Sequence, residues 1–492
     1  MRLMELMRDL PATVEPPSRE LEVTGITHDS RRVQPGDLFV ALVGQRFDGR
    51  VFVPQALERG AAAVVAQGAP PPGFGGCWIE TADPRGLLAP LAARLYGHPD
   101  RELLMIGVTG TNGKSTVIEL VASMLEGSGR ACGRLGTLGY RFGGRALAAT
   151  RTTPEASDLF RMLREARELG AEAMAMEVSS HALALGRVAE VGYDVAVFTN
   201  LTRDHFDFHA DFESYFSAKR SLFDQLAEGG RAVLNVDDSY GRRLAGSLPG
   251  AMTYGREGMV RPGEVDLDRH GIRGELVTPR GALAFASRLL GRFNLENLMA
   301  AVAVGEALEL DRDAMAIALS HALPLPGRME SVERGQEFLA LIDYAHTDAA
   351  LEAALRSTRE LIGPRGRLIA VFGCGGDRDA GKRVLMGRVA GRLADRPIAT
   401  SDNPRSEDPM AILAAVEEGL RQAGRGDGYE LIEDRREAIR RAVAAARPGD
   451  AVLVAGKGHE QVQIVGAEEF PFSDQDELAR AIEEGSIGGH GR

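Results

Sequence analysis

Residues 103–125 form the part of the sequence that most limits the folds this chain can adopt. They start with an apolar run, Leu103–Val108, which is long enough for a buried strand, and continue into the loop Gly-Thr-Asn-Gly-Lys-Ser. Apolar residues then recur at helical spacing, at Val117, Leu120, Val121 and Met124. A strand, a glycine-rich loop and a helix in this order predict an α/β fold with a phosphate site at the helix N-terminus.

The chemistry of the loop fits ATP. Its backbone N–H groups can close on phosphate oxygens, Lys114 can reach the β- and γ-phosphates, and the Ser115 hydroxyl can bind Mg²⁺. The loop is shorter than the usual G-x-x-x-x-G-K-[ST] pattern, because Val108 stands where the first glycine would fall. An ordinary glycine turn before a helix is the alternative. We favour the phosphate site because the strand, the loop, the Lys-Ser pair and the helix agree.

The charge balance and the apolar pattern exclude several classes of protein. A net charge of −12 argues against nucleic-acid binding through phosphate contacts. The sequence has no run of about 18 apolar residues, so we expect no membrane span. Acidic residues near the N-terminus replace the apolar core of a signal peptide. Cys77, Cys132 and Cys374 are too widely spaced for a metal motif or a disulfide framework, and we expect a cytoplasmic protein.

Lysine is scarce in this chain, and its few positions are informative. The 58 basic residues include only four lysines, which are Lys114, Lys219, Lys382 and Lys457. Arginine stays protonated and presents a planar fork, whereas lysine is compact and can lose its proton. The lysines are therefore candidates for sites where a guanidinium cannot substitute. For Lys219, in the helical segment 214–223, a solvated surface lysine is the ordinary alternative.

The length of 492 residues predicts about two to four domains, and the pattern of segments divides the chain into three. Residues 1–102 predict a smaller N-terminal α/β domain with short strands and a proline- and glycine-rich loop. Residues 103–326 predict a central P-loop-type parallel sheet with helices. Residues 327–492 alternate apolar strands with helical segments, which predicts a C-terminal Rossmann-like α/β domain.

Polar residues follow two predicted strands of the central domain. The strand at residues 173–178 ends in Glu177, and the strand at residues 195–199 is followed by a loop that contains His205. Ligands bind at the carboxyl ends of strands in an open parallel sheet. Glu177 and His205 are therefore placed to hold a metal near the phosphates, and a structural carboxylate is the alternative for Glu177.

Four predicted strands of the C-terminal domain also end in polar loops. These loops contain Asp-Tyr-Ala-His, Gly-Cys-Gly-Gly-Asp-Arg, Ser-Asp-Asn-Pro-Arg and Gly-Lys-Gly-His-Glu. If the sheet is parallel, the four loops meet at one edge. Cys374 in the second loop has no activating partner in the sequence. We interpret it as a small residue in a tight turn rather than as a nucleophile.

The motifs together resemble the Mur ligases of bacterial cell-wall synthesis. The segments that carry the resemblance are GTNGKS, EVSSH, TNLTRDH, the helix around Lys219, DYAHT, GCGGDRD, DNPR and AGKGHE. They span all three predicted domains. GTNGK alone is shared with folylpolyglutamate synthases, whereas DNPR after GCGGDRDAGKR is similar to the Mur ligases that add meso-diaminopimelate rather than lysine.

The resemblance implies a set of residues for ATP and magnesium. The ATP-binding set comprises Gly110, Thr111, Asn112, Gly113, Lys114, Ser115, Thr116, Asn294, Arg328, Asp343 and His346. The magnesium set comprises Ser115, Glu177, His205 and a carbamylated Lys219. Carbamylation converts a lysine into a carboxylate, which arginine cannot imitate because it stays protonated. The implied catalytic residues are Lys114, Lys219 and His205.

The resemblance also implies two further substrate sites. The UDP-sugar and dipeptide set comprises Thr27, His28, Asp29, Ser30, Gln45, Arg46, Phe47, Thr152, Thr153, Ser179, Leu185 and Arg187. Leu185 departs from the glutamine that some relatives have. The diaminopimelate set comprises Arg383, Asp402, Asn403, Pro404, Arg405, Gly456 and Glu460.

The reaction implied by the resemblance is ATP-dependent amide formation by a monomer. The γ-carboxylate of D-Glu in UDP-MurNAc-L-Ala-D-Glu would form an acyl phosphate, which the amine of meso-diaminopimelate would then attack. The same ligation with L-lysine and a folylpolyglutamate synthase are the nearest alternatives. A P-loop ATPase that couples hydrolysis to motion or transport and a non-catalytic nucleotide-binding module are alternatives of other classes.

Overall fold

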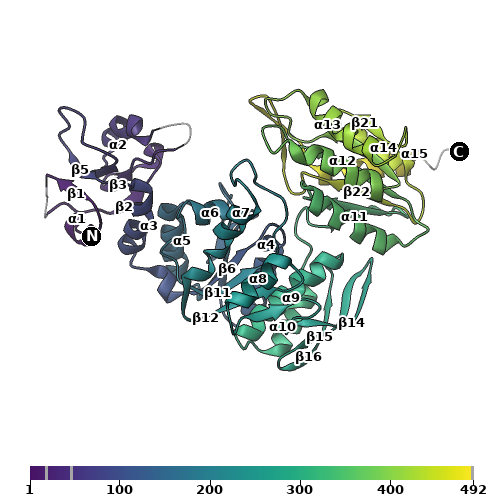
Figure 1. Cartoon of the computed structure of the whole chain (residues 1–492), viewed down its shortest axis with the longest axis horizontal. Helices are drawn as coiled ribbons and strands as arrows, with labels where there is room; N and C mark the ends of the chain where they lie inside the picture. Colours follow the sequence, from purple (N-terminus) through teal and green to yellow (C-terminus); the bar gives the residue numbers. More distant parts are fainter. Residues whose placement is uncertain (17–19, 45–47, 489–492) are drawn as a thin grey trace.

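The computed structural model describes residues 1–16, 20–44 and 48–488 and arranges them around three main sheets. Figure 1 shows the N-terminal part at one end of the molecule, the central part in the middle and the C-terminal part on the far side. This architecture confirms the predicted α/β class with a central phosphate-loop sheet and smaller flanking sheets. The proposed boundaries at residues 102 and 326 stay predictions.

The central sheet has eight strands in the order β13-β12-β11-β6-β10-β7-β8-β9. The strands are β6 (Leu104–Thr109), β7 (Cys132–Gly136), β8 (Gly139–Phe142), β9 (Arg145–Leu147), β10 (Ala173–Glu177), β11 (Tyr193–Phe198), β12 (Leu226–Asn235) and β13 (Met252–Tyr254). Pairing is parallel from β13 to β7 and antiparallel from β7 to β9. The prediction of a parallel sheet therefore omitted an antiparallel edge, which arises because a two-residue turn can only join antiparallel strands.

Strand β6 lies in the middle of this sheet because both of its faces are apolar. Met105 packs into the core cluster on one face, while Ile106 and Val108 pack into the cluster on the other. A strand buried on both faces reads as a continuous apolar run rather than as an alternating one. The central helices are α4 (Lys114–Gly127), α5 (Ala156–Glu168), α6 (Ser180–Ala184), α7 (Phe212–Arg220), α8 (Ser239–Ser247), α9 (Arg292–Ala307) and α10 (Arg312–His321).

A three-stranded antiparallel sheet follows the central one, and the sequence analysis assigned no element to it. Its strands are β14 (Arg261–Asp268), β15 (Gly271–Thr278) and β16 (Gly281–Ser287). Its apolar residues, which include Ile272 and Phe285, join the core cluster that also contains α4 and α9. The small sheet thus extends the core on one face of the central sheet.

The N-terminal sheet has five strands in the order β1-β5-β4-β3-β2. Its elements are α1 (Leu3–Leu6), β1 (Thr13–Glu15), β2 (Gly25–Thr27), β3 (Asp37–Val40), α2 (Val53–Glu58), β4 (Ala63–Ala66), β5 (Cys77–Glu80) and α3 (Pro84–Leu95). Leu91 of α3 and Phe160 of α5 belong to one core cluster. A shared apolar core therefore fixes the N-terminal part on the central part.

The C-terminal sheet has the order β17-β18-β22-β19-β20-β21, and pairing is parallel from β18 to β21. Its strands are β17 (Glu330–Ser331), β18 (Leu339–Asp343), β19 (Leu368–Cys374), β20 (Arg396–Ser401), β21 (Glu430–Ile432) and β22 (Ala451–Ala455), and a separate hairpin comprises β23 (Val462–Val465) and β24 (Glu468–Pro471). The four polar loops noted in the sequence therefore share one edge, as predicted.

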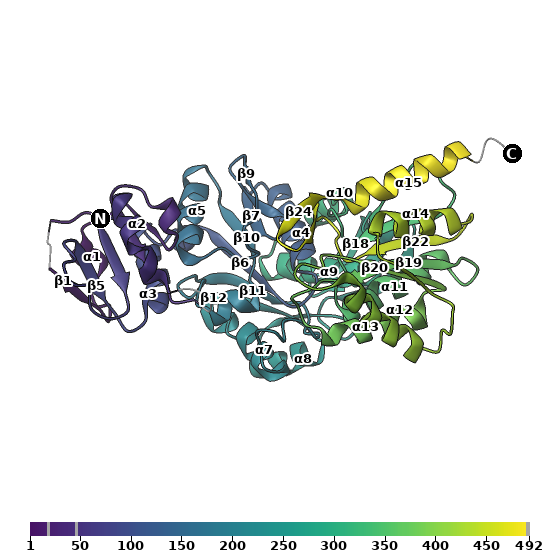
Figure 2. The same ribbon diagram turned by 90° about the horizontal axis from the view of Figure 1, so that it is seen from above.

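Helices cover both faces of this sheet. Helices α11 (Asp348–Ile362), α12 (Gly381–Leu393) and α13 (Pro409–Gln422) pack on one face, and α14 (Arg435–Ala445) and α15 (Asp474–Gly488) pack on the other. Figure 2 shows α14 and α15 side by side at the C-terminal end of the molecule. This doubly wound arrangement confirms the predicted Rossmann-like domain. Across the described ranges, no helix is both long and apolar enough to cross a membrane.

We expect Arg435→Met to lower the free energy of unfolding by about 3–5 kcal/mol. Arg435 and Asp474 form an ion pair with N···O 2.7 Å, and both side chains are 0% exposed. Removal of the guanidinium leaves Asp474 as an unpaired buried charge. Arg436→Met is the matched control, because that neighbouring side chain is 44% exposed and its pair with Glu477 is worth at most about 1 kcal/mol. Urea denaturation checks both values, and equal losses would contradict the prediction.

Candidate active site

The phosphate loop closes tightly because two of its residues are glycines. Gly110 has φ +150° and Gly113 has φ +86°, which is the region that disfavours side chains. A Cβ at Gly110 would lie 1.8 Å from Thr199 Oγ1, and one at Gly113 would lie 2.3 Å from Asn297 Oδ1. The loop is thus packed against the end of β11 and the start of α9, and the helix predicted after the loop is α4, which begins at Lys114.

Lys114 and Lys219 bring two positive charges to the same loop. The Lys114 ammonium donates to the carbonyl oxygens of Gly110 (3.0 Å) and Thr111 (2.9 Å). Lys219 Nζ donates to the carbonyl oxygen of Gly110 (2.7 Å) and lies 4.6 Å from the centre of the Tyr215 ring. Burial lowers the pKa of both lysines, and the charge of Lys114 lowers the pKa of Lys219 further.

Lys219 is therefore not the solvated surface lysine that its helical position would suggest. Its side chain is 1% exposed and has no carboxylate within ion-pair distance among the described residues. A low pKa keeps part of a lysine population neutral at physiological pH, and a neutral amine can react with CO₂. The environment of Lys219 fits the carbamylation that the family resemblance implies.

Ser115 and Glu177 form an oxygen pair beside the loop. Ser115 Oγ donates to Glu177 Oε1 (2.7 Å), and the Thr137 N–H donates to the same oxygen (2.9 Å). Glu177 is 1% exposed at the end of β10, next to β6. Hydroxyl and carboxylate oxygens are the ligands that Mg²⁺ prefers, so this pair fits the predicted metal.

His205 lies on the loop after β11. Its Nε2 is 3.4 Å from Asp204 Oδ2, and its ring centre is 4.8 Å from that of His181. Burial lowers the pKa of His205, which leaves the imidazole neutral and able to bind a metal. In the described parts of the chain, no three His, Cys, Asp or Glu side chains gather as a metal site. The predicted magnesium set would therefore depend on the Ser115 hydroxyl and a carbamate on Lys219.

A cavity of about 250 Å³ lies between the phosphate loop and the C-terminal part. Its lining includes Asn112, Gly113, Ser115, Thr116, Asn297, Arg328, Asp343, Tyr344 and His346. The Arg328 guanidinium lies 4.7 Å from the centre of the Tyr344 ring. Burial raises the pKa of Asp343 to about 6, and its carboxylate accepts the N–H groups of Met329 and Ala345. Most of the predicted nucleotide residues therefore face one space.

Asn294 does not line this cavity but supports a residue that does. Asn297 Nδ2 donates to Asn294 Oδ1 (2.9 Å), and Asn294 Nδ2 donates to the carbonyl oxygen of Leu290 (2.8 Å). Asn297 faces Gly113 of the phosphate loop. The predicted ATP-binding set contains Asn294 but not Asn297. Helical periodicity alone could not show which of them faces the loop.

A second cavity, of about 340 Å³, lies between the loop that contains His205 and the polar loops of the C-terminal sheet. The central part contributes Thr152, His181, Asp204, His205 and Asp207 to its lining. The C-terminal part contributes Tyr344, His346, Gly375, Arg378, Asp379, Lys382, Asp402, Asn403, Arg405, Gly456 and Glu460. Arg203 and Asp379 form an ion pair across the two parts (3.1 Å). Residues from distant parts of the sequence thus border one space.

The Asp-Asn-Pro-Arg loop is held in a defined conformation. Arg405 has φ +51°, its N–H donates to the carbonyl oxygen of Ile464 (3.1 Å), and its Nη1 donates to the carbonyl oxygen of Gly376 (2.7 Å). Asp402 Oδ2 is buried and has no hydrogen-bond partner in the described structure. A Cβ at Gly456 would lie 2.7 Å from that oxygen. The loop therefore presents one guanidinium and one unsatisfied carboxylate oxygen.

Lys457 is a member of this network that the sequence analysis singled out only for its rarity. Its side chain is 0% exposed, and its Nζ lies 2.9 Å from Asn403 Oδ1 and 3.0 Å from Glu460 Oε2. Asn403 Nδ2 also donates to Glu460 Oε2 (2.8 Å). Lys457 thus fixes two of the predicted diaminopimelate residues. Arg383, by contrast, pairs with Glu407 (2.8 Å), and Arg383 and Pro404 are absent from the cavity lining.

The predicted dipeptide residues divide into two groups. Thr153 is fully buried: its Oγ1 donates to the carbonyl oxygen of Glu177 (2.8 Å) and accepts the Ser179 N–H (3.0 Å). Arg187 pairs with Glu155 (2.9 Å). Thr153 therefore positions the end of β10, whereas Thr152 lines the second cavity and Leu185 is half-buried at the end of α6.

The predicted uridine residues lie at the junction of the N-terminal and central parts. His28 follows β2, and its Nδ1 is 3.0 Å from Ser157 Oγ on α5. Burial lowers the pKa of His28. Ser30 Oγ donates to Gln55 Oε1 (2.6 Å). Gln45, Arg46 and Phe47 were also predicted here, but they lie outside the described residues.

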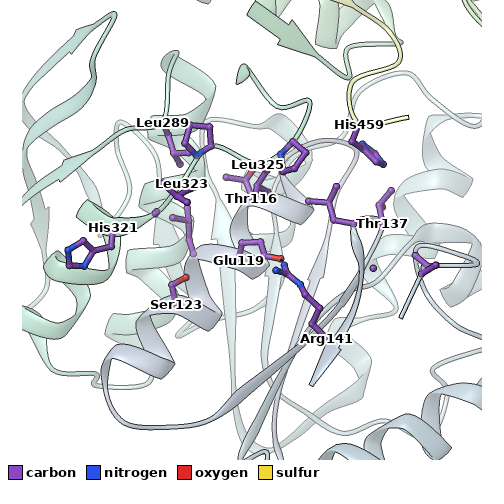
Figure 3. A pocket seen from close by; sticks show the side chains of 18 residues that line it. Thr116, Glu119, Ser123, Thr137, Arg141, Leu289, His321, Leu323, Leu325 and His459 are labelled. Atoms are coloured by element: carbon purple, nitrogen blue, oxygen red, sulfur yellow. The ribbon is translucent and has the colours of Figure 1, made fainter. Parts of the chain in front are cut away.

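A third cavity, of about 740 Å³, lies on the other side of α4. Figure 3 shows Glu119 and Arg141 facing one another in its middle, with Leu323 and Leu325 on one wall and His459 on another. Glu119 and Arg141 form an ion pair. Thr116 is the only predicted site residue in its lining among the described residues. The cavity is bordered by the segment that leads to the C-terminal part.

Comparison with known proteins agrees with this geometry. Models described as Mur ligase middle domain, as Mur ligase, glutamate ligase domain, and as Mur ligase family, catalytic domain match residues 108–305, 327–458 and 22–86. A UDP-N-acetylmuramoyl-L-alanyl-D-glutamate–2,6-diaminopimelate ligase of Geobacter metallireducens is 44% identical over 100% of both chains. One of Gloeobacter violaceus is 45% identical over 98% of each.

The chain belongs to the Mur ligase family.

Solved structures place this Mur ligase among proteins of the same fold. A structure of a UDP-N-acetylmuramoyl-L-alanyl-D-glutamate–2,6-diaminopimelate ligase has a TM-score of 0.67 and 33% identity, and the match covers 98% of this chain and 99% of that one. A folylpolyglutamate synthase of Mycobacterium tuberculosis, complexed with ADP and AMPPCP, has a TM-score of 0.60 and 18% identity over 74% of this chain and 91% of that one. The second likeness shows a shared fold only.

Proposed function

We propose that this Mur ligase joins meso-diaminopimelate to the γ-carboxylate of D-Glu in UDP-MurNAc-L-Ala-D-Glu, with ATP as co-substrate, during synthesis of the bacterial cell wall. The observation that carries the proposal is the 340 Å³ cavity. Asp204 and His205 line it from the phosphate-loop side, and Asp402, Arg405 and Glu460 line it from the other side. The names of the relatives from Geobacter and Gloeobacter support the same reaction.

The first step brings one anion against another, because a carboxylate must attack the γ-phosphate of ATP. Lys114 and the N–H groups at the start of α4 would bind the phosphates and offset that repulsion. Mg²⁺ held by Ser115, Glu177, His205 and a carbamylated Lys219 would add positive charge at the transferred phosphoryl group. In the nucleotide cavity, Asn297, Arg328, Asp343 and His346 would contact the rest of ATP, with Asn294 behind Asn297.

The second step forms the amide. The amine of the amino acid attacks the acyl carbonyl, the C–N bond forms, and phosphate leaves. Asp402 Oδ2 is buried and has no hydrogen-bond partner among the described residues, and Glu460 lines the same cavity, so these carboxylates suit an ammonium group. Arg405 suits the far carboxylate of diaminopimelate, which it can bind through two parallel hydrogen bonds.

This arrangement gives a physical reason for selecting diaminopimelate over lysine. Lysine lacks the far carboxylate, so the Arg405 guanidinium would keep its hydrogen bond to the Gly376 carbonyl oxygen but its charge would stay unpaired. An unpaired buried charge costs about 3–5 kcal/mol, which corresponds to at least about a hundredfold discrimination. The unsatisfied Asp402 oxygen and the fixed Arg405 loop therefore favour a substrate with both charges at its far end.

The remaining substrate groups would lie along the central and N-terminal parts. Thr152, Thr153, Ser179, Leu185 and Arg187 are proposed for the muramyl dipeptide, and Thr27, His28, Asp29, Ser30, Gln45, Arg46 and Phe47 for the uridine. We expect the enzyme to work as a monomer in the cytoplasm. One chain supplies both walls of the 340 Å³ cavity, so a second copy is not needed to complete it.

We expect the purified protein to release phosphate from ATP only when Mg²⁺, UDP-MurNAc-L-Ala-D-Glu and meso-diaminopimelate are all present. With L-lysine in place of diaminopimelate, kcat/KM falls at least about a hundredfold because Arg405 stays unpaired. A coupled assay for phosphate checks both statements, and mass spectrometry of the tripeptide product identifies the bond.

Other outcomes of this assay would select an alternative. Equal or faster release with L-lysine would keep the ligase and reject the role of Arg405. Release that needs neither amino acid would indicate an ATPase of another kind. Absence of nucleotide turnover under every condition would favour a non-catalytic nucleotide-binding protein.

A further inference from the structure

Lys382 is the lysine that the proposed function leaves without a role. It is the second residue of α12, and it lines the 340 Å³ cavity. It is 8% exposed, yet no hydrogen bond or ion pair of its ammonium group occurs among the described residues. Its position is unfavourable in a second way, because a cation at the positive end of a helix is repelled by the helix dipole. Such a group requires an anion that enters the cavity from outside the chain.

Three of the carboxylates that line this cavity are already paired, and Asp402, which also lines it, makes no hydrogen bond or ion pair with Lys382 in the described structure. Asp379 is paired with Arg203 (3.1 Å), and Glu460 is paired with Lys457 (3.0 Å). Asp204 lies 3.4 Å from the His205 imidazole. The ammonium group of Lys382 therefore remains available for a ligand.

The surroundings of Lys382 indicate which anion its ammonium group binds. Lys382 lines the 340 Å³ cavity together with Asp204 and His205, which lie on the loop after β11. Thr202 of the same loop donates its N–H to Thr111 of the phosphate loop (3.0 Å). Besides burial, the positive charge of Lys382 also helps to lower the pKa of His346, a residue of the nucleotide cavity. His346 lines both cavities, so the cavity that contains Lys382 adjoins the nucleotide cavity. In the proposed reaction the phosphoryl group passes from ATP to the substrate carboxylate beside this junction of the two cavities.

We propose that Lys382 binds the phosphoryl group of the acyl phosphate and holds it while the amino acid attacks. The inference rests on the proposed ligase function and assigns it a further catalytic residue. In this step the amine nitrogen forms a bond to the acyl carbon, and the bond from that carbon to the phosphate oxygen breaks. The electron pair of the broken bond leaves with orthophosphate, which also takes up the proton that the amine loses. Lys382 stabilises the negative charge that grows on the departing phosphate.

The scarcity of lysine agrees with this role. Arginine occupies 54 of the 58 basic positions, and the residue next to Lys382 is Arg383. A compact ammonium can follow one phosphate oxygen as the bond breaks, whereas a guanidinium is a larger and rigid fork. We therefore expect that Lys382→Arg restores only part of the activity that Lys382→Met loses.

The test compares steady-state kinetics of wild-type enzyme, Lys382→Met, Lys382→Arg and Arg388→Met. Arg388 is an exposed basic residue on the same helix and serves as the control. We expect Lys382→Met to lower kcat by about 10²–10³-fold, which is the loss seen when one donor to a developing oxyanion is removed. KM for diaminopimelate should stay unchanged, because an interaction made only in the transition state does not alter ground-state binding. Arg388→Met should resemble wild type.

Chemical trapping of the acyl phosphate gives a second measurement, and a purely structural role of Lys382 would leave its result unchanged. Borohydride reduces an acyl phosphate to the corresponding alcohol, which mass spectrometry detects. We expect Lys382→Met to yield at least as much trapped alcohol as wild type while it yields less amide. ATP affinity, measured by calorimetry, should be unchanged and shows that the variant is folded. If Lys382→Met is unstable, Lys382→Gln takes its place.

Three outcomes would overturn the inference. They are a kcat of Lys382→Met equal to that of Arg388→Met, a rise in KM for diaminopimelate with kcat unchanged, or loss of the trapped alcohol together with the amide. The second outcome would assign Lys382 to the amino-acid carboxylate instead. Failure of the wild-type enzyme to ligate diaminopimelate would reject the proposed function itself, which is a separate result.

Discussion

The Arg405→Ala variant is expected to lose at least about a hundredfold in kcat/KM for meso-diaminopimelate while its affinity for ATP stays unchanged. Arg405 lines the 340 Å³ cavity, and its backbone is fixed by the hydrogen bond to Ile464. Removal of one partner of a buried charge pair costs about 2–5 kcal/mol, because the carboxylate of the substrate is left unpaired. Arg405 is absent from the lining of the nucleotide cavity, so ATP should bind as before.

Two further variants separate this effect from general damage. Arg405→Lys keeps a positive charge but loses the two parallel hydrogen bonds, so it should fall between wild type and Arg405→Ala. Arg421→Ala changes an exposed arginine on α13 and should retain full activity. Kinetics with diaminopimelate and calorimetry with ATP provide the readouts. An equal loss of ATP affinity and diaminopimelate addition in Arg405→Ala would contradict the assignment.

The Lys219→Arg variant is expected to lose at least about a thousandfold in kcat. A carboxylate formed on Lys219 would support positive charge at the phosphoryl group, and such stabilisation is worth several kcal/mol, with about 1.4 kcal/mol for each factor of ten. Arginine keeps the original charge but cannot form a carbamate, because its guanidinium stays protonated. The buried position and lowered pKa of Lys219 are the conditions under which the neutral amine can react with CO₂.

The matched control for this prediction is Arg220→Met, which alters the next residue of α7, a half-exposed arginine near Asp224. It should remain close to wild type. Wild-type enzyme that is prepared and assayed without CO₂ should lose activity and regain it with bicarbonate, and ¹³C-bicarbonate should label the protein at Lys219. Activity that does not respond to CO₂, or a Lys219→Arg variant with more than about a tenth of wild-type kcat, would contradict the carbamate.

Local patterns predicted much of the fold. The apolar run before Gly110, the two glycines and the apolar spacing after Lys114 act within one stretch of chain, so β6, the loop and α4 could be predicted from residues 103–125. Four strands of the C-terminal sheet, β18, β19, β20 and β22, also agree within about two residues with the apolar segments that predicted them, since parallel strands buried on both faces have a strong signal. The edge strands β17 and β21 were not predicted. The antiparallel edge β7–β9 and the sheet β14–β16 have shorter or alternating apolar patterns, and these were not predicted.

Side-chain partners were harder to predict than elements. The sequence analysis selected Asn294 instead of Asn297 and left Lys457 out of the substrate sites. Both choices have the same cause, because the role of these residues depends on which face of a helix or loop meets another part of the chain. Thr153 is fully buried and supports Glu177 and Ser179, which no local pattern could show. Hydrogen-bond partners of this kind are set by packing between segments that are distant in the sequence.

The sequence by itself determined the chemistry that this Mur ligase can offer: a phosphate loop, polar residues at strand ends, and four lysines among many arginines. Those properties depend on residue identity and on spacing of a few positions. Only the tertiary structure decided that Asp204, Lys382 and Arg405 border one cavity and that Lys382 has no partner among the residues that the structure describes. Such contacts depend on how two sheets are placed against each other, and that placement is the sum of many packing contacts rather than a property of any single segment.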